Sequence, residues 1–306
     1  MKGNLPPILP VGTQVVTCCP IRDPYGREIR PSGGVAVVVH APLEAGQRYR
    51  IRFADGETVK LRRHDLRVLS HDQDAALGEN PSSEDLFSHV IYRCVVGSRA
   101  FGLDEESSDV DIRGVYLPPA HLQWSLTGVP DLIERTDADE CYWELQRFLV
   151  LALKANPNIL ECLFTPKIEM ATSLGEELRA IRRCFLSRFI HKTYNGYVLS
   201  QFKKLRKSVE RESSIKWKHA MHLIRLLLSG ITALKTGHLE LDVGVHRIRL
   251  LAIKKGEVPW ADLESWRREL QGEFDAAVET SPLPDRPDYR RVERFLIDAR
   301  RSMVNP

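Results

Sequence analysis

The chain has 306 residues, of which 43% are hydrophobic and 28% charged, and its formal net charge is +3. These values are typical of a soluble chain with two or three domains, and they exclude disordered, collagen-like and small disulfide-bonded proteins. No apolar run approaches the roughly 20 residues that a bilayer span needs, and the first residues lack the apolar stretch of a signal peptide. The six cysteines show no CxxC spacing. We therefore expect reduced thiols and a cytoplasmic protein without membrane contact.

Charge is distributed unevenly along the chain. The net charge is +5 over residues 1–70, −13 over residues 71–178, +11 over residues 179–225 and zero over residues 226–306. An acidic block followed by a basic block is what a site needs if it holds divalent cations beside a polyanion, such as a nucleoside triphosphate or a nucleic acid. Two solvated charged surfaces are the alternative interpretation.

Residues 1–70 alternate short β-branched runs with turn residues, which predicts a small antiparallel β-barrel. Strands are expected at residues 13–18, 35–40, 48–53 and 58–61. Asp55-Gly56 is a hairpin signal between the last two strands, which place arginines on one face and apolar residues on the other. The pattern resembles small barrels of the Src-homology (SH3-like) and Tudor types. A polar, turn-rich linker at residues 71–83 marks a domain boundary.

From residue 84 onward the pattern becomes mixed α/β, with a helical turn at 84–88, a strand at 90–96, a Gly-Ser turn and a strand at 110–117. Beyond residue 141 only helices are expected: one over 141–154, one opened by Pro157, a long one capped by Ser213 or Ser214 and ended by Gly237, and amphipathic segments near 261–280 and 287–303. The predicted fold is therefore α+β and multidomain. Its parts are the barrel (1–70), the linker (71–83), an α/β core (84–178) and a helical C-terminal domain (179–306).

The densest chemical signal is a Gly-Ser turn followed by an Asp-x-Asp pair. A buried strand ends at Gly97, whose backbone can approach a ligand, and Ser98 with the next N–H groups would cradle phosphate oxygens at a helix N-terminus. Asp109 and Asp111 lie two apart on the next strand, so we expect both carboxylates to project from one face while Val110 and Ile112 face the core. An exposed acidic pair at a strand end is the alternative.

Two neighbouring carboxylates repel each other, so without a cation one of them would take up a proton. One or two Mg²⁺ or Mn²⁺ ions bound between them, together with substrate phosphates, would keep both ionised. A pair of ions about 3.5–4 Å apart can stabilise the attacking and leaving oxygens of an in-line displacement, so the motif indicates nucleotidyl or phosphoryl transfer. It is not a phosphate-binding P-loop, because Leu103-Asp104 stands where Lys and Ser/Thr are required.

The Gly-Ser turn, the ten-residue spacing and the Asp-x-Asp pair resemble the nucleotidyltransferase superfamily typified by DNA polymerase β. Within it, residues 92–255 resemble the RNA-repair-pathway-associated nucleotidyltransferases (RlaP family). The matching segments are residues 97–102, 108–114, 156–163, 185–187, 196–197 and 218–226. The resemblance implies a polymerase-β-type core that transfers a nucleoside monophosphate from a nucleoside triphosphate to a hydroxyl and releases pyrophosphate. It says nothing about residues 1–70.

The same resemblance implies roles for individual residues. Gly97 and Ser98 would hold the triphosphate, and Asp109 and Asp111 would act as catalytic, metal-ligating carboxylates. The superfamily uses a third carboxylate on a following strand, often the group that helps to deprotonate the attacking hydroxyl. Asp139 is favoured for it, because it ends a short strand just before the helix expected from residue 141. Glu144 is second, and the other acidic residues within reach are Asp131, Glu134, Asp137 and Glu140.

Several basic residues could complete such a site. Arg99 could contact phosphates or pair with Glu105 or Glu106, and Arg113 is expected to orient a carboxylate by a charge-assisted hydrogen bond. On the helix expected over 215–235, four residues share one face: Lys218, Met221, His222 and Arg225. Lys218 could reach the triphosphate from there, with a solvated lysine as the alternative. His219 and His222 lack further ligands nearby, which favours packing over metal binding.

Aromatic and basic residues also interleave near residue 197, a combination used to bind single-stranded nucleic acid. The candidate acceptor-binding residues are Tyr197, Lys203, Lys204, Arg206 and Lys207. An amphipathic helix with Tyr194 and Tyr197 in the core is the alternative. We expect Mg²⁺-dependent transfer to an RNA end, with the acceptor held by the barrel and the 179–225 helices. The other hypotheses are nucleotidylation of a protein or small-molecule hydroxyl, and a non-catalytic nucleic-acid-binding protein.

Overall fold

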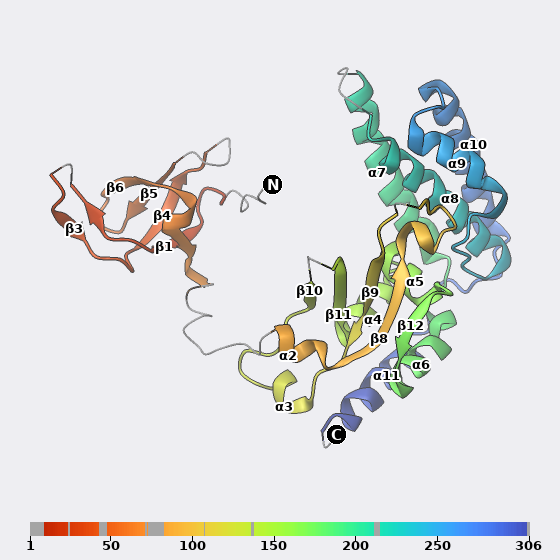
Figure 1. The fold of residues 1–306 in the computed structure, drawn as a ribbon, viewed down its shortest axis with the longest axis horizontal. Coiled ribbons are helices and arrows are strands. Elements are labelled where there is room, and N and C mark those ends of the chain that lie inside the picture. The colour runs from red at the N-terminus through yellow and green to blue at the C-terminus, as the bar shows by residue number, and fades with distance from the viewer. Residues whose placement is uncertain are drawn as a thin grey trace. The chain divides into compact units, whose positions relative to one another are not determined.

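A computed structural model describes residues 9–23, 25–42, 48–70, 72, 83–106, 108–135, 138–210 and 215–304. The chain divides into two compact units, residues 1–80 and 81–306. The fold is mixed α+β, with strands in both units and, from residue 173 onward, only helices and connecting turns among the described residues (Figure 1). The residues predicted as an α/β core and a helical domain thus form a single compact unit. Most of the predicted linker lies outside the described residues.

The first unit is built around a five-stranded antiparallel sheet in the order β6-β5-β4-β1-β7. Its strands are β1 (Gln14–Thr17), β4 (Val35–His40), β5 (Tyr49–Phe53), β6 (Thr58–Leu61) and β7 (Leu66–Val68), and a separate ribbon pairs β2 (Ile21–Arg22) with β3 (Glu28–Arg30). The hairpin predicted at Asp55-Gly56 is present, and Gly56 has a φ of 88°.

The predicted closure into a barrel is not formed by the described residues, because the edge strands β6 and β7 do not pair with each other. A 3-10 turn at Arg63–Asp65 follows β6 and leads into β7, which pairs with β1 instead. The sheet still buries one face. Tyr49, Ile51 and Phe53 of β5 point into the core, whereas the residues between them point outward, as the alternation along a strand requires.

The second unit contains a mixed five-stranded sheet in the order β10-β11-β9-β8-β12, in which only β9 and β11 are parallel neighbours. Its strands are β8 (Val90–Val96), β9 (Asp111–Tyr116), β10 (Leu132–Arg135), β11 (Glu140–Glu144) and β12 (Ile168–Ala171). The prediction that only helices follow residue 141 is therefore wrong for β11 and β12. Cys141-Tyr142-Trp143 is a short apolar run, and periodicity alone cannot distinguish a central strand of this length from the start of a helix.

Helices cover both faces of this sheet. Helices α4 (Leu145–Leu153), α5 (Pro157–Phe164) and α6 (Ser173–Ala180) pack against β8 and β9, while the short α2 (Ser83–Phe87) packs against β10 and α3 (Ala120–Gln123) follows β9. The two hydrophobic clusters that result include Tyr92 and Val115 on one face and Ile112 and Tyr142 on the other. Asp111 and Arg113 alternate with Ile112 and therefore share the face of α4 to α6.

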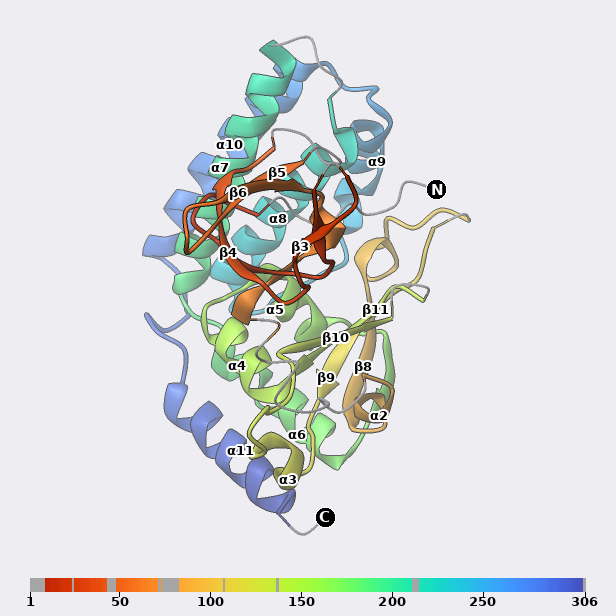
Figure 2. The same ribbon diagram turned by 90° about the vertical axis from the view of Figure 1, so that its left-hand side faces the viewer.

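The remaining helices pack around α8 (Trp217–Thr236). Helices α7 (Phe189–Glu210), α9 (Arg247–Lys255) and α10 (Trp260–Glu279) contact α8, and α11 (Tyr289–Ser302) returns to pack on α4 (Figure 2). Short 3-10 turns lie at Arg182–Phe185 and Gly244–His246. As predicted, Pro157 opens α5 and Gly237 ends α8 with a φ of 73°. Helix α8 begins after Lys216, and the predicted caps Ser213 and Ser214 lie outside the described residues. No helix within the described ranges combines the length and apolarity needed to cross a bilayer.

Candidate active site

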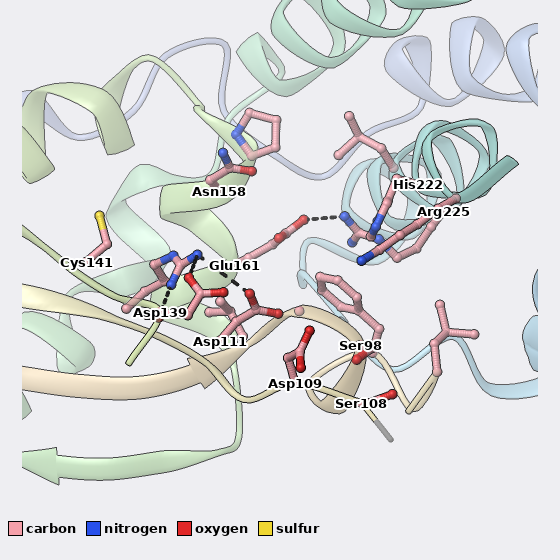
Figure 3. A pocket seen from close by; sticks show the side chains of 18 of the residues that line it. Ser98, Ser108, Asp109, Asp111, Asp139, Cys141, Asn158, Glu161, His222 and Arg225 are labelled. Carbon is pink, nitrogen blue, oxygen red and sulfur yellow. Dashed lines mark hydrogen bonds and ion pairs between the residues drawn. The ribbon is translucent and has the colours of Figure 1, made fainter. Parts of the chain in front are cut away.

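A polar cavity of about 960 Å³ is lined by residues from the β9–β11 part of the sheet, the turn after β8, and helices α5 and α8 (Figure 3). Its wall on the sheet side carries carboxylates, among them Asp109, Asp111 and Asp139. Its wall on the α8 side carries Lys218 and Arg225. The cavity therefore brings together acidic and basic side chains that lie about 100 residues apart in the sequence.

The turn after β8 places backbone against one of these carboxylates. Gly97 begins a 3-10 turn (Gly97–Arg99) with a φ of 70°, and a Cβ atom at this position would lie 2.0 Å from Asp111 Oδ2. Both the backbone conformation and the close approach of Asp111 therefore require glycine. Ser98 lines the cavity beside it. Arg99 instead donates a hydrogen bond to the Ser108 carbonyl at 3.0 Å, which fixes the following loop.

Asp111 and Asp139 lie close together because β9 and β11 are parallel neighbours. Asp111 begins β9, Asp139 directly precedes β11, and the Ile112 N–H donates to the Asp139 carbonyl at 3.2 Å. Asp139 has a φ of 49°, a left-handed conformation that costs free energy in a residue other than glycine and is concentrated at functional sites.

The structure differs from expectation at Asp109, which precedes β9 rather than belonging to it. Its side chain is exposed and lines the cavity, but strand alternation does not hold it in place. Val110 is 38% exposed instead of facing the core. The reason is that β9 pairs with β8 only from Asp111 onward, so the two residues before it lie outside the ladder.

Arg113 connects the two carboxylates of the sheet. Its guanidinium donates to Asp139 Oδ1 at 3.0 Å and to the Asp139 carbonyl at 2.6 Å, and it lies 3.6 Å from Asp111 Oδ1. This is the orienting role expected for Arg113. Burial, followed by the nearby charge of Asp139, nevertheless raises the pKa of Asp111 above its usual value, and Arg113 and Lys218 offset only part of that rise. The uncharged form of Asp111 is therefore favoured relative to that of a solvent-exposed aspartate.

The motif implies an Mg²⁺ or Mn²⁺ ion at this site. Within the described ranges, no three His, Cys, Asp or Glu side chains converge closely enough to form a ready-made metal site. However, Mg²⁺ is commonly held by one or two carboxylates together with water and substrate phosphates. The two carboxylates Asp111 and Asp139, which line the same cavity as Ser98 and Lys218, are oxygen donors that fit an ion bound together with a phosphate-bearing substrate.

The other acidic candidates for the third carboxylate have different surroundings. Glu140 is buried, and its two oxygens accept hydrogen bonds from Arg93 and Tyr142 at 2.9 Å each. Glu144 caps the N-terminus of α4 and pairs with Arg300. Asp131 is exposed beside Arg147, Glu134 lines the cavity from β10, and Asp137 lies outside the described residues. Asp139, whose carboxylate pairs with Arg113, and Glu134 are thus the candidates that line the cavity and neither cap a helix nor lie buried in the sheet.

The opposite wall contains a buried ion pair that was not singled out from the sequence. Arg225 of α8 donates to Glu161 Oε1 of α5 at 2.6 Å, and the two side chains are only 7% and 9% exposed. The Arg225 guanidinium stacks over the Phe101 ring at 3.7 Å. Its Nε and Nη1 atoms are buried without a hydrogen-bond partner among the described residues. A signal was present: a glutamate within the apolar run Ile159–Leu163 needs a buried cation.

The remaining predicted residues occupy different places. Lys218 is exposed, lines the cavity and has no ion-pair partner among the described residues. Tyr197, 44% exposed, lines the cavity, whereas Tyr194 is buried in the core. Of the basic acceptor candidates on α7, Arg206 pairs with Glu264 at 2.9 Å. The others, Lys203, Lys204 and Lys207, are exposed farther along the helix and do not line the cavity.

The two histidines of α8 also line the cavity. His222 packs edge-on against Phe101, and burial together with the charges of Arg225 and Lys218 lowers its pKa to about 4. The pKa of His219 is lowered by burial and by Lys216 and Lys204. Both imidazoles are therefore mainly neutral near pH 7.

Residues 101–105, which continue the Gly97 turn, are held by the helical region. The Val243 N–H donates to the Phe101 carbonyl at 3.0 Å, and Arg247 donates to the carbonyls of Gly102 and Asp104 at 2.7 and 3.1 Å. Lys254 pairs with Glu105 at 2.6 Å, which lowers the pKa of that carboxyl. The sheet side and the α8 side of the cavity are therefore joined by direct hydrogen bonds.

The fold and the cavity together define an α+β protein whose polar site places carboxylates opposite the cations Lys218 and Arg225. The chain belongs to the RNA repair pathway DNA polymerase beta family (RlaP), whose profile matches residues 69–298. This confirms the family assignment made from the motifs.

Two curated relatives are also similar to the chain. It is 34% identical over 97 residues to the uncharacterized protein YcgL of Bacillus subtilis, and the match covers 30% of this chain and 37% of YcgL. It is 24% identical over 175 residues to the uncharacterized protein MJ0002 of Methanocaldococcus jannaschii, covering 53% of this chain and 68% of that protein. The family points to a polymerase-β-like nucleotidyltransferase in RNA repair.

Proposed function

We propose that the protein is a metal-dependent nucleotidyltransferase that transfers a nucleoside monophosphate from a nucleoside triphosphate to a hydroxyl at an RNA end. The new bond joins the acceptor oxygen to the α-phosphorus, the bond from the α-phosphorus to the bridging oxygen breaks, and pyrophosphate leaves. The observation that carries the proposal is the approach of Asp111 to the Gly97 turn, with Asp139 beside it and Lys218 and Arg225 across the same cavity.

The residues of the cavity have separate roles in the proposed reaction. Ser98 and the backbone of its turn bind phosphate oxygens at one end of the triphosphate, while Lys218 and the unpartnered Nε and Nη1 of Arg225 bind phosphates from the other wall. Arg113 holds Asp111 and Asp139 in place, and Asp139 accepts the proton of the attacking hydroxyl. Mg²⁺ or Mn²⁺ bound with the substrate at Asp109, Asp111 and Asp139 would stabilise the charge that develops on the attacking and leaving oxygens.

The acceptor is expected to enter past Tyr197, whose half-exposed ring lines the cavity and offers a stacking surface. Beyond it, exposed lysines continue along α7, at positions 203, 204 and 207. An RNA end fits this combination because base stacking needs an aromatic ring and the strand behind it needs cations.

The test is incubation with each labelled nucleoside triphosphate, Mg²⁺ and a set of RNA ends, followed by gel analysis and pyrophosphate measurement. Asp111→Asn is expected to lower incorporation by at least 100-fold, whereas Asp131→Asn, an exposed acidic residue outside the cavity, should lose less than twofold. Equal activity of the two variants would remove Asp111 from the mechanism. Pyrophosphate release that depends on a protein or small-molecule acceptor, with no RNA labelling, would replace the RNA-end proposal.

A further inference from the structure

The outward surface of the N-terminal sheet carries basic side chains in adjacent positions. Arg50 and Arg52 of β5 and Lys60 of β6 are exposed, and Arg50 lies directly opposite Lys60 in the β5/β6 ladder. On the other side of β5, His40 of β4 is the exposed register partner of Arg50. We call these four residues the basic face.

No acidic side chain neutralises the basic face among the described residues of this unit. Asp55 and Glu57 both pair with Arg30, and Asp72 pairs with Arg67 at 2.7 Å. Asp65 accepts a backbone hydrogen bond and lies 3.4 Å from His64. The ion pairs of the described part of the unit include none of the three outward cations on β5 and β6, so their positive charge is available to a partner.

This arrangement costs stability, because like charges directly opposite each other in an antiparallel ladder destabilise it by up to about 1 kcal/mol. Protection of an edge strand against unwanted pairing accounts for Lys60, since β6 is at the sheet edge. It does not account for Arg50 and Arg52, because β5 is paired on both sides. Arginine binds phosphate through two parallel N–H donors, so these two positions match a phosphodiester backbone.

The neighbours of these cations indicate which part of the partner they contact. The register partners of Arg52 are Val37 and Thr58, so the outward positions between the cations are small and not aromatic. Apart from His40, the basic face has no ring on which a base could stack, and such a surface of cations binds the sugar–phosphate backbone and carries little sequence information. It is chemically distinct from the cavity of the second unit, which contains Tyr197 and the carboxylates.

We propose that the basic face binds the phosphodiester backbone of RNA, as a contact separate from the cavity in which transfer takes place. The choice of RNA as the polyanion rests on the proposed function, and an acidic protein surface is the competing occupant. Binding should depend steeply on salt, because each phosphate contact releases counterions, with a slope of about 0.7 per contact on a single strand.

The experiment measures binding of a labelled 20-nucleotide single-stranded RNA to the full chain by fluorescence anisotropy, without nucleotide and with chelator present. The face variant is Arg50→Thr/Arg52→Thr/Lys60→Thr, because threonine suits strands. The matched control, Arg22→Thr/Arg27→Thr/Arg67→Thr, removes the same charge at exposed positions on β2, before β3 and on β7. We expect the face variant to bind at least tenfold more weakly, with a salt slope lower by about 2, and the control to change less than twofold.

Two readouts keep the proposal open to refutation. Calorimetry should show that the face variant unfolds at the same or a higher temperature, since it relieves a like-charge pair. If it unfolds at a lower temperature, the single variant Arg52→Gln is used instead. That variant should weaken RNA binding about threefold and lower the salt slope by about 0.7. Equal weakening by both triple variants, or by neither, overturns the proposal. Competition by polyglutamate as effective as by unlabelled RNA would assign the face to an acidic protein instead. Because no nucleotide or divalent cation is present, failure of the incorporation assay leaves this result standing, and the reverse also holds.

Discussion

The buried pair of Arg225 and Glu161 allows stability and ligand binding to be separated. Both side chains are less than 10% exposed and form one hydrogen bond at 2.6 Å, while Arg225 also stacks on Phe101 and its Nε and Nη1 find no hydrogen-bond partner among the described residues. Removing one partner of such a pair leaves a buried charge uncompensated and typically costs about 3–5 kcal/mol. Glu161→Gln should therefore lower the free energy of unfolding by roughly that amount.

Replacing both partners by apolar residues of similar size should have a much smaller effect. The double variant Glu161→Leu/Arg225→Met removes both desolvated charges, and such exchanges are often neutral or stabilising by about 1–4 kcal/mol. Nucleotide affinity should follow the opposite order. Glu161→Gln retains the cation and should bind triphosphate within about threefold of the unchanged chain, whereas the double variant should lose at least tenfold.

Urea denaturation followed by tryptophan fluorescence is the appropriate stability assay, because all five tryptophans lie in the second unit and report its unfolding alone. Triphosphate binding is measured by titration with Mg²⁺ present. A double variant as unstable as Glu161→Gln would show that the cost does not come from an unpaired buried charge. A double variant that binds triphosphate normally would show that the unpartnered N–H groups of Arg225 do not contact the nucleotide.

Three further outcomes are expected. Gly97→Ala should abolish incorporation and destabilise the second unit, because its Cβ would lie 2.0 Å from Asp111 Oδ2. The control is Gly128→Ala, at a similar positive φ but with no atom within 4 Å of the added Cβ, which should lower the free energy of unfolding by only about 1 kcal/mol and keep activity. The free energy of unfolding should fall by up to about 3 kcal/mol as the pH drops from 6.5 to 4, because His222 takes up a proton in the unfolded chain but, with a pKa of about 4, not in the folded chain. His222→Gln should flatten this pH dependence in urea titrations. An unchanged pH dependence would refute the lowered pKa of His222. Lys218→Ala should weaken triphosphate binding about tenfold and monophosphate binding much less in the same titration, and equal losses would argue against a contact with the outer phosphates.

Local signals in the sequence were sufficient for much of the fold. Strand β8 has the predicted bounds, because an apolar run ends at a glycine that needs positive φ. The start of α5 was predictable from Pro157 and the end of α8 from Gly237, since the fixed φ of proline and the positive φ of glycine are properties of the residue's own backbone. The family could likewise be identified from short motifs. These features depend on a few consecutive residues and so need no knowledge of the tertiary structure.

The parts that were missed depend on long-range packing. Strand β11 is apolar at Cys141 and Tyr142 because it is a central strand, and this pattern resembles the start of the helix that follows it. The pairing of Arg225 with Glu161 joins residues 64 positions apart and becomes visible only when α8 packs beside α5. Asp139 was expected to end a short strand before a helix, whereas it directly precedes β11, and the left-handed backbone that the turn into β11 imposes on it was not predicted.

The hydrogen bonds from Arg247 and Val243 to the backbone of residues 101–104 bear on how the protein can be shortened. A fragment that ended before Val243 would lose these donors, and residues 101–104 would no longer be held by the helical region. A fragment limited to the mixed sheet would therefore lack the α8 wall of the cavity, and residues 101–104 would be less firmly held. Any useful truncation should retain the chain through α9 and remove residues from the N-terminal side instead.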